Sequence, residues 1–418
     1  MPHVPSAPFF ASRSDLIVLA RRRYFEEGRA PTGVISDAVF QSWARCQRLH
    51  VDPARRVEFE PVTASRTQLA LLKHWQLREA WQGELRELEA VLAATSCAAM
   101  LTEPSGVLIG ATCAGRAHEH LMPVATRLGV NLSEEAVGTT APGVVARTGQ
   151  PVTVHSAEHF FDHVGAMHCA AAPIHDIDGH LAGVLDISSE GLPFDFDAAA
   201  VVGLYAGAME NRLLVAQSRE HLVLRFQVAA SLLDTPVVGL VGIDAFGKLA
   251  WRNGTAAKLL GISDGPRSMP RQERARPAAD AALGASLARL ASLPADGAAP
   301  ITLPNGLLVW ARASMRAADG QRQLFNGFAP TAGAAVPRPG TADPALADDS
   351  VAPEAMALTP AESGQARPDR PSVKALRDVD MDLIESALAA CGGNVSEVAR
   401  KLQVSRGLIY RRLRERAA

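Results

Sequence analysis

The sequence has no long hydrophobic run and few cysteines, and each absence excludes a class of protein. No stretch reaches the roughly 18 consecutive apolar residues that a membrane-spanning helix needs. Arginines follow the short apolar segment at residues 16–20, whereas they precede it in a secretory leader. The five cysteines form no C-x-x-C pair, which argues against a disulfide framework or a structural zinc knuckle and is typical of a reducing compartment. We therefore expect a cytoplasmic protein that does not bind a membrane.

An excess of charge of either sign is also lacking. The chain has 42 Lys and Arg residues against 44 Asp and Glu residues, a net charge of −2, so it has no overall attraction to nucleic acid. Residues 394–418 differ, because they carry seven basic and two acidic side chains, a local charge of +5 that leaves −7 for the rest of the chain. Any nucleic-acid-binding surface is therefore expected at this end.

Composition also divides the 418 residues, a length that suffices for two or three domains. Residues 330–372 contain eight prolines and no aromatic residue, so they cannot bury enough surface to fold. We predict that they form a disordered Pro/Ala-rich linker ahead of a small C-terminal unit, residues 373–418. Two larger modules, residues 65–220 and 222–329, precede the linker, and residues 1–64 form an N-terminal helical segment.

Four tight turns that end in glycine predict antiparallel hairpins in the two modules. Each turn separates two apolar runs, and glycine supplies the positive φ that closes such a turn. With the helical stretches around them, they indicate an α+β multidomain fold: antiparallel sheets flanked by helices, followed by a small all-α C-terminal unit. The turns are residues 103–106, 176–179, 244–247 and 317–320.

Apolar periodicity predicts three helices around these hairpins. One covers residues 68–94, and a shorter one over residues 281–293 has Asp280 as its N-cap. A long helix over residues 196–233 is expected to bridge the modules and to pair two subunits of a homodimer. Its apolar positions are Leu204, Ala208, Leu222, Phe226, Ala229 and Leu233.

Residues 152–180 hold six of the twelve histidines, and residues 155–159 fit the H-x-x-E-H pattern of inverzincin metalloproteases. That site needs both histidines one helical turn apart on a shared face. The alternation in residues 150–154 predicts a strand, and Ser156 is expected to cap a short helix over residues 157–164. Because His155 would then lie outside the helix, we expect no metal and no cofactor. A metal-dependent hydrolase built around His155–His163 stays open as an alternative.

Residues 242–249 are one residue short of a phosphate-binding Walker A loop. The last position must be Ser or Thr to hold Mg²⁺, and it is Leu249. Asp244 and Phe246 also place an anion and a bulky ring where phosphate needs bare backbone N–H groups. Apolar runs on both sides of this segment predict a hairpin turn and no ATP site.

The C-terminal unit combines the local basic charge with three predicted helices. An apolar stripe over residues 379–388 stops at Gly392-Gly393, Asn394 caps a second helix, and Ser405 caps a third after a short turn. Two helices joined in this way form a helix-turn-helix, whose second helix enters the major groove of double-stranded DNA. The alternative is a basic amphipathic helix that docks on the body of the protein or forms a dimer seam.

The exposed face of the last helix supplies the candidate DNA contacts. Residues at the start of a recognition helix usually reach base edges, so Arg406 is the first candidate for sequence readout, and Gly407 allows close approach. The remaining side chains are suited to phosphates or further bases. The candidate set is Ser405, Arg406, Gly407, Tyr410, Arg411, Arg412 and Arg414.

Several motifs occur in the order of a known family. Residues 35–215 resemble the acetoin-catabolism regulator family of bacterial transcription activators, whose sensor is a GAF domain. Residues 234–261 resemble the first half of a PAS domain, and residues 393–413 are similar to the Fis-type helix-turn-helix. The motifs in the sensor are Ser42–Cys46, Val51–Pro53, Ser133–Thr140, Glu158–Phe160, Ala172–Gly179 and Gly183–Ser188.

The resemblance implies an unidentified small-molecule effector in a GAF-like cavity. The family usually places an AAA+ ATPase between its sensor and its DNA-binding end, but the Pro/Ala linker stands there in this sequence. ATP-driven, sigma-54-type promoter opening is therefore not expected. The resemblance implies cavity residues near Glu134, Gly138, Thr139, Thr140, His155, Glu158, His159 and Cys169.

The sequence therefore predicts a DNA-binding transcriptional regulator, not an enzyme, that is controlled by a small-molecule ligand and has no ATPase of its own. As a homodimer it would read half-sites about one helical turn apart, and it would recruit or block RNA polymerase. Besides the hydrolase, the alternative is a non-enzymatic sensor whose tail binds a protein partner.

Overall fold

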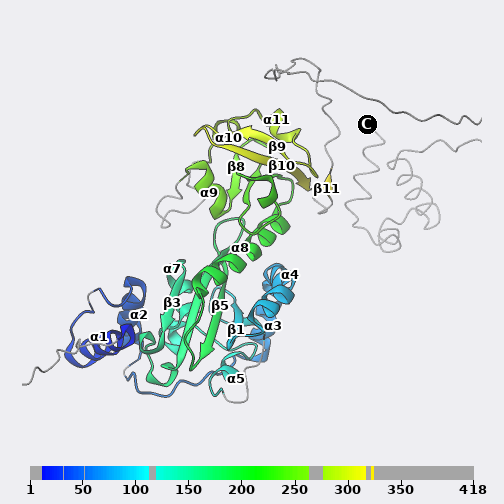
Figure 1. Cartoon of the computed structure of the whole chain (residues 1–418). Helices are drawn as coiled ribbons and strands as arrows, with labels where there is room; N and C mark the ends of the chain where they lie inside the picture. The colour runs from blue at the N-terminus through cyan, green and yellow to red at the C-terminus, as the bar shows by residue number, and fades with distance from the viewer. Residues whose placement is uncertain are drawn as a thin grey trace, which may run out of the picture. The chain divides into compact units, whose positions relative to one another are not determined.

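The computed structural model describes residues 12–31, 33–50, 52–112, 119–262, 276–316 and 322–323 (Figure 1). The chain divides into two compact units, residues 1–333 and 334–418, and all described residues belong to the first unit. The predicted linker and C-terminal unit lie outside the described residues. Within the described part, no helix is long and apolar enough to cross a membrane.

The first sheet has five antiparallel strands in the order β2-β1-β5-β4-β3. The central strand, β5, runs from Leu181 to Glu190 and pairs with β1 on one side and β4 on the other. The turn glycines Gly106 and Gly179 have φ values of 90° and 77°, so the predicted hairpins form. The other strands are β1 Cys97–Thr102, β2 Leu108–Ala111, β3 Val152–His155 and β4 Met167–His175.

Helices α4, Trp75–Leu92, and α8, Ala198–Gln217, cover one face of this sheet. The side chains that they bury are apolar, such as Leu101, Leu185 and Ile187. Successive side chains of a strand point to opposite faces, so Val184, Asp186 and Ser188 point away from these helices. The arrangement leaves two chemically different faces on one sheet.

The second face is covered by short helices and loops from several parts of the chain. Its core includes the fully buried Trp43, Phe160 and Phe161, which join other aromatic rings around Tyr24 and Phe25. The covering helices are α1 Arg13–Glu27, α2 Asp37–Leu49, α5 Met122–Ala125, α6 Glu134–Val137 and α7 Ala141–Thr148. Helix α3, Ala64–Lys73, precedes α4.

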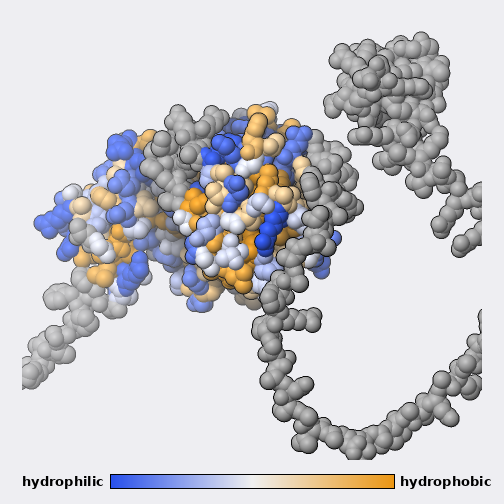
Figure 2. All heavy atoms as spheres, turned by 90° about the horizontal axis from the view of Figure 1, so that it is seen from above, coloured by the Kyte–Doolittle hydropathy of each residue, from blue (hydrophilic) through white to orange (hydrophobic). Residues whose placement is uncertain are grey.

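The second module is a six-stranded antiparallel sheet with the path β11-β10-β6-β7-β8, and β9 pairs with β10. Its buried core includes Leu224, Phe226, Val241 and Val309. Figure 2 shows apolar and polar residues mixed over the described surface seen from above. The elements are β6 Leu222–Gln227, β7 Gly239–Ile243, β8 Leu249–Arg252, α9 Gly254–Leu260, α10 Ala279–Leu283, α11 Leu287–Ala291, β9 Ala299–Thr302, β10 Leu308–Arg316 and β11 Arg322–Gln323, with a 3₁₀ turn at Ala230–Leu232.

The prediction of one bridging helix over residues 196–233 is wrong. Helix α8 ends at Gln217, the Ser218 hydroxyl donates back to the Leu214 carbonyl at 2.6 Å, and Glu220 takes a φ of 61° that no helix allows. Residues 222–227 then form β6, where pairing with β7 and β10 outweighs the helical spacing of the apolar residues. Phe226 and Leu233 are buried within the first unit, so they do not form the subunit-pairing face that we expected.

Two further helix predictions need correction. The helix expected over residues 68–94 is divided at His74 into α3 and α4. The helix expected over residues 281–293 is interrupted by Gly284, which has a φ of 69°, and Ser286 caps the short helix α11. Asp280 lies inside α10 and is not its N-cap. The two antiparallel sheets with flanking helices confirm the α+β class for the described residues.

Candidate ligand-binding site

The histidine-rich segment does not form the predicted helix over residues 157–164. It forms two 3₁₀ turns, Ser156–Glu158 and Asp162–Val164, with Ser156 at a φ of 47°. The Glu158 carboxylate accepts the backbone N–H of His155 at 2.8 Å, so it closes the first turn. Since His155 ends β3 and only a short 3₁₀ turn follows it, the H-x-x-E-H groups do not share one face of an α-helix.

The histidine rings of this segment also face different partners. His159 is buried, and its Nδ1 lies 2.9 Å from the Ser156 carbonyl oxygen, which can only accept. Nδ1 therefore carries the proton, and Nε2, at 3.4 Å from Cys169 Sγ, accepts from the thiol. The His155 Nδ1 lies 3.4 Å from the Nδ1 of His168 instead.

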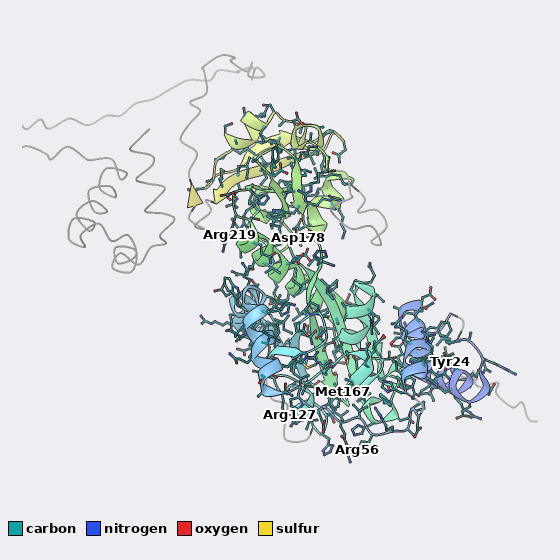
Figure 3. All side chains as sticks on the ribbon, turned by 180° about the vertical axis from the view of Figure 1, so that it is seen from behind. Tyr24, Arg56, Arg127, Met167, Asp178 and Arg219 are labelled. Atoms are coloured by element: carbon teal, nitrogen blue, oxygen red, sulfur yellow. The ribbon has the colours of Figure 1, made fainter. Side chains whose placement is uncertain are left out.

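Among the described residues, three potential metal ligands come close together in the turn between β4 and β5: Asp176, Asp178 and His180. Figure 3 labels Asp178 in this turn and Met167 at the other end of β4. Asp176 Oδ1 already accepts the backbone N–H groups of Asp178 and His180 at 3.0 and 2.8 Å, so it closes the turn. The His155–His163 segment forms no such group among the described residues.

Burial sets the protonation of this region. It lowers the pKa of His159 to about 4 and raises the pKa of the Glu158 carboxyl and of the Cys169 thiol. Burial also raises the pKa of Asp186 to about 7, although its hydrogen bond from Ser188 acts in the opposite direction. The imidazole and the thiol are therefore uncharged near neutral pH.

The residues near α6 and α7 mostly contact helix α2. Glu134 is buried, and its carboxylate accepts two hydrogen bonds from the Arg45 guanidinium at 2.7 and 2.6 Å. The Thr139 hydroxyl lies 2.8 Å from that of Ser42. Both partners come from the Ser-Trp-Ala-Arg-Cys motif, so this motif holds the loops above the second face of the sheet.

Gly138 and Thr140 shape the chain between these helices. Gly138 has a φ of 71°, and a Cβ there would lie 2.8 Å from the Phe161 ring, so only glycine fits. The Thr140 hydroxyl accepts the Gly143 N–H at 3.3 Å and caps α7. Both residues position the loop through backbone geometry.

Two more contacts fasten the N-terminal helices to the histidine-rich segment. The Trp43 indole N–H donates to the Glu158 carbonyl at 2.6 Å. From α1, the Arg21 guanidinium donates to the carbonyl of Phe160 at 2.7 Å and to that of His159. The N-terminal segment therefore forms one wall over the second face.

Asp186 and Ser188 are two polar residues of this face that the sequence analysis did not propose as site residues. Both are fully buried, and the Ser188 hydroxyl donates to Asp186 Oδ2 at 2.6 Å. Ser188 is paired with Cys169 across β4 and β5, which places both beside His159. The sequence signal was present: Asp and Ser occupy alternate positions in the apolar strand Gly183–Ser188.

The near-match to a Walker A loop is a hairpin turn, as predicted. Asp244 Oδ1 accepts the backbone N–H groups of Phe246 and Lys248 at 2.9 and 3.0 Å, and Gly247 has a φ of 70°. The turn joins strands β7 and β8, whereas a phosphate loop joins a strand to a helix. Phe246 at its tip is 88 % exposed.

The N-terminal and C-terminal parts of the chain each match a known protein family. Residues 16–199 match the family described as MimR, N-terminal domain, and residues 375–415 match the bacterial regulatory proteins of the Fis family. The second match covers all the predicted DNA contacts, Ser405 to Arg414, which lie outside the described residues.

Three curated relatives are transcriptional regulators. The acetoin catabolism regulatory protein of Cupriavidus necator is 29 % identical over 242 residues, 55 % of this chain and 36 % of the relative. The acetoin dehydrogenase operon activator AcoR of Bacillus subtilis is 29 % identical over 49 % of this chain and 34 % of its own length. The propane 2-monooxygenase operon activator MimR of Mycolicibacterium smegmatis is 28 % identical over 40 % and 28 %. The chain thus spans about a third of the length of these relatives.

A solved structure, the Escherichia coli DhaR(N)–DhaL complex, aligns with a TM-score of 0.39 and 16 % identity over 66 % of this chain and 99 % of the matched chain. The chain is a homologue of the acetoin-catabolism regulators and the MimR-type activators, with a MimR-type N-terminal sensor domain and a Fis-type helix-turn-helix near its C-terminal end.

Proposed function

We propose that the chain is a cytoplasmic, DNA-binding transcriptional regulator whose sensor domain responds to a small molecule. The match of residues 375–415 to the Fis-family regulators carries this proposal. The concentration of basic side chains in the same segment supports it, because DNA binding depends on neutralising phosphates. In this arrangement the sensor domain binds the effector and the helix-turn-helix binds double-stranded DNA.

The effector is proposed to be small and uncharged. Two relatives are named for acetoin and one for propane 2-monooxygenase, which link them to small uncharged organic compounds. The second face of the first sheet supports a site of this kind, because it gathers buried polar groups among apolar ones. Cys169 and the segments from Glu134 to Thr140 and from Glu158 to His159 lie on or above this face, whereas His155 alternates to the opposite face and packs against Phe194.

Control is proposed to proceed without ATP hydrolysis by this chain. The nearest sequence to a phosphate loop, residues 242–249, is a hairpin turn. The regulator would then act as a homodimer that recruits or blocks RNA polymerase, and the PAS-like second module would relay the signal. The linker proposed from the sequence at residues 330–372 would let the DNA-binding unit, residues 373–418, reach its site on DNA independently of the sensor.

DNA binding by the full-length protein tests this function. Duplexes selected from a random library serve as probes, and fluorescence anisotropy measures the dissociation constant as salt increases. Arg406→Ala should weaken binding to the preferred sequence about tenfold or more, since one base contact contributes about 1–3 kcal/mol of discrimination. Arg411→Ala should weaken binding to all sequences and reduce the slope against salt by about one.

Arg29→Ala is the matched control, because its side chain is 72 % exposed and lies in the sensor unit. Equal DNA affinity for wild type, Arg406→Ala and Arg411→Ala would contradict the proposal. Capture of a protein partner that depends on Arg411 and Arg412, without DNA affinity, would favour the protein-binding tail instead.

A further inference from the structure

A groove of about 670 Å³ runs beside helices α4 and α8, which lie side by side (Figure 1). Residues of the second module form one wall of it, and the Asn211 side chain on α8 donates to the Pro236 carbonyl of that wall at 2.9 Å. The two helices cover the face of the first sheet that is opposite to the proposed effector site. The groove is therefore a separate place in the fold.

Acidic side chains predominate in the lining of this groove. Four carboxylates and two arginines line it, which gives a net charge of −2. Two of the carboxylates, Glu84 and Asp234, already accept hydrogen bonds from arginines. The other two, Glu79 and Glu87, are exposed and form no ion pair with a described residue. The groove therefore attracts a cation.

Tyr205 lines the groove from α8 and has an unsatisfied hydroxyl. The residue is only 6 % exposed, and its hydroxyl forms no hydrogen bond with the described residues. Burial and the negative charges of Glu87 and Glu84 raise the pKa of the phenol, so it stays protonated near neutral pH. Buried hydroxyls are nearly always hydrogen-bonded, so this one indicates a missing partner in the groove.

The side chains beside Tyr205 are apolar and favour an organic ligand. Ala80 on α4 and Leu204 and Ala208 on α8 line the same groove. Leu204 is 44 % exposed although it is a large apolar residue. A hydrated metal ion would gain nothing from this surface, whereas an alkyl chain would remove it from water.

We propose that this groove binds a small aliphatic primary amine, whose ammonium group donates hydrogen bonds to the Glu87 carboxylate and to the Tyr205 oxygen. An ammonium group has three donors and no acceptor, so one group satisfies both oxygens. The alkyl chain then packs on Leu204 and Ala208. Because both modules line the groove, the amine contacts the sensor domain and the second module together. This site is additional to the proposed effector site and does not depend on it.

Calorimetry and ligand-observed NMR on the full chain, in a buffer without amines, test the proposal with four probes. Butylamine carries the ammonium group, butanol and butyrate replace it with a neutral and a negative group, and magnesium chloride supplies a cation without an alkyl chain. Butylamine should bind at least about fivefold more tightly than the other three, since hydrogen bonds between charged groups are the stronger ones.

Each failure among the probes has a distinct meaning. Equal binding of magnesium would show an acidic surface without selection for an amine, and equal binding of butanol would show an apolar groove without selection for charge. Either result would overturn the proposal, and so would the absence of butylamine binding to the wild type.

Substitutions then locate the contact. Glu87→Gln keeps the shape of the side chain and should weaken butylamine binding at least about fivefold, because it removes the charge-assisted hydrogen bond. Tyr205→Phe should weaken it about threefold and leave the thermal stability unchanged, because the lost hydroxyl has no partner in the protein. Glu79→Gln should have a smaller effect than Glu87→Gln, since Glu87 is the unpaired carboxylate that lies near the phenol.

Glu89→Gln is the matched control, because it removes an exposed carboxylate from the same helix outside the groove. Wild-type affinity for butylamine in either Glu87→Gln or Tyr205→Phe would overturn the proposal. An equal loss of affinity in Glu89→Gln would assign the binding to overall charge and would also overturn it. The readout contains no DNA and no effector, so these failures leave the proposed regulatory function intact.

Discussion

The two faces of the first sheet share five strands and both carry a hydrophobic core, but they differ in the polar groups that β5 buries. Against α4 and α8 the strands bury apolar side chains such as Leu185 and Ile187. On the other face the same strand, β5, buries Asp186 and Ser188. Burying a carboxyl costs stability that an apolar residue would not. One face of β5 therefore contributes only apolar side chains, while the other also buries a carboxyl whose Oδ1 has no hydrogen-bond partner among the described residues.

The largest expected effect concerns Asp186. Burial raises its pKa from 3.8 to about 7, so the folded protein keeps a proton that the unfolded chain releases. The stability contribution of this group falls as pH rises from about 4 to about 7, by a total of about 4 kcal/mol at 1.36 kcal/mol per pKa unit. The free energy of unfolding of Asp186→Asn, relative to wild type, should therefore increase by up to about 4 kcal/mol across this range. Urea denaturation at each pH measures it, and a constant difference would contradict a buried titrating carboxyl.

His159 should show the opposite pH dependence on the same face. Burial lowers its pKa from 6.5 to about 4, so between these pH values the imidazole is protonated in the unfolded chain but not in the folded protein. Stability from this group is complete above pH 6.5 and is lost as pH falls toward about 4, which amounts to about 3 kcal/mol. His159→Gln should therefore gain stability relative to wild type as the pH is lowered. Urea denaturation at each pH measures this difference in the free energy of unfolding. If the difference between His159→Gln and wild type stays constant from neutral pH to about pH 4, the imidazole is not buried.

The smallest effect belongs to the apolar face. Ile187→Val removes one buried methyl group and should cost about 1 kcal/mol. Because its two cross-strand neighbours, Ala99 and Ala170, are apolar, the loss should be the same near pH 5 and near pH 8. Leu69→Val, at a side chain that is 65 % exposed, should change stability by less than about 0.5 kcal/mol. If the stability lost in Ile187→Val depended on pH, the two faces would not differ in the pH dependence of their contribution to stability.

Local signals in the sequence predicted local structure well. The turns at residues 103–106, 176–179 and 244–247 were identified because Gly106, Gly179 and Gly247 need a positive φ whatever surrounds them. The fourth predicted turn, residues 317–320, lies outside the described residues, although β10 and β11 on either side of it pair antiparallel.

Contacts between segments that lie far apart along the chain could not be predicted from the sequence. Residues 222–227 have apolar spacing that suits a helix or a strand, and pairing with β10, which lies about 85 residues away along the chain, decides for the strand. Arg45 and Glu134 are separated by 89 residues, so their ion pair has no local signature. The unpaired carboxyl oxygen of Asp186 could not be predicted for a related reason. Its position in strand β5 was visible, but the missing partner of Oδ1 becomes apparent only when the opposite elements are in place.

Hydrogen bonds from α1 and α2 hold the histidine-rich segment and α6 in place, so the first fifty residues should be needed for a folded sensor. Arg21, Trp43 and Arg45 fasten this region to the carbonyls of residues 158–160 and to Glu134. A shortened protein that begins after residue 50 would therefore lose more than a dispensable tail. It would expose the Phe160 and Phe161 rings to water and open the sensor on one side, so effector response and solubility should disappear together.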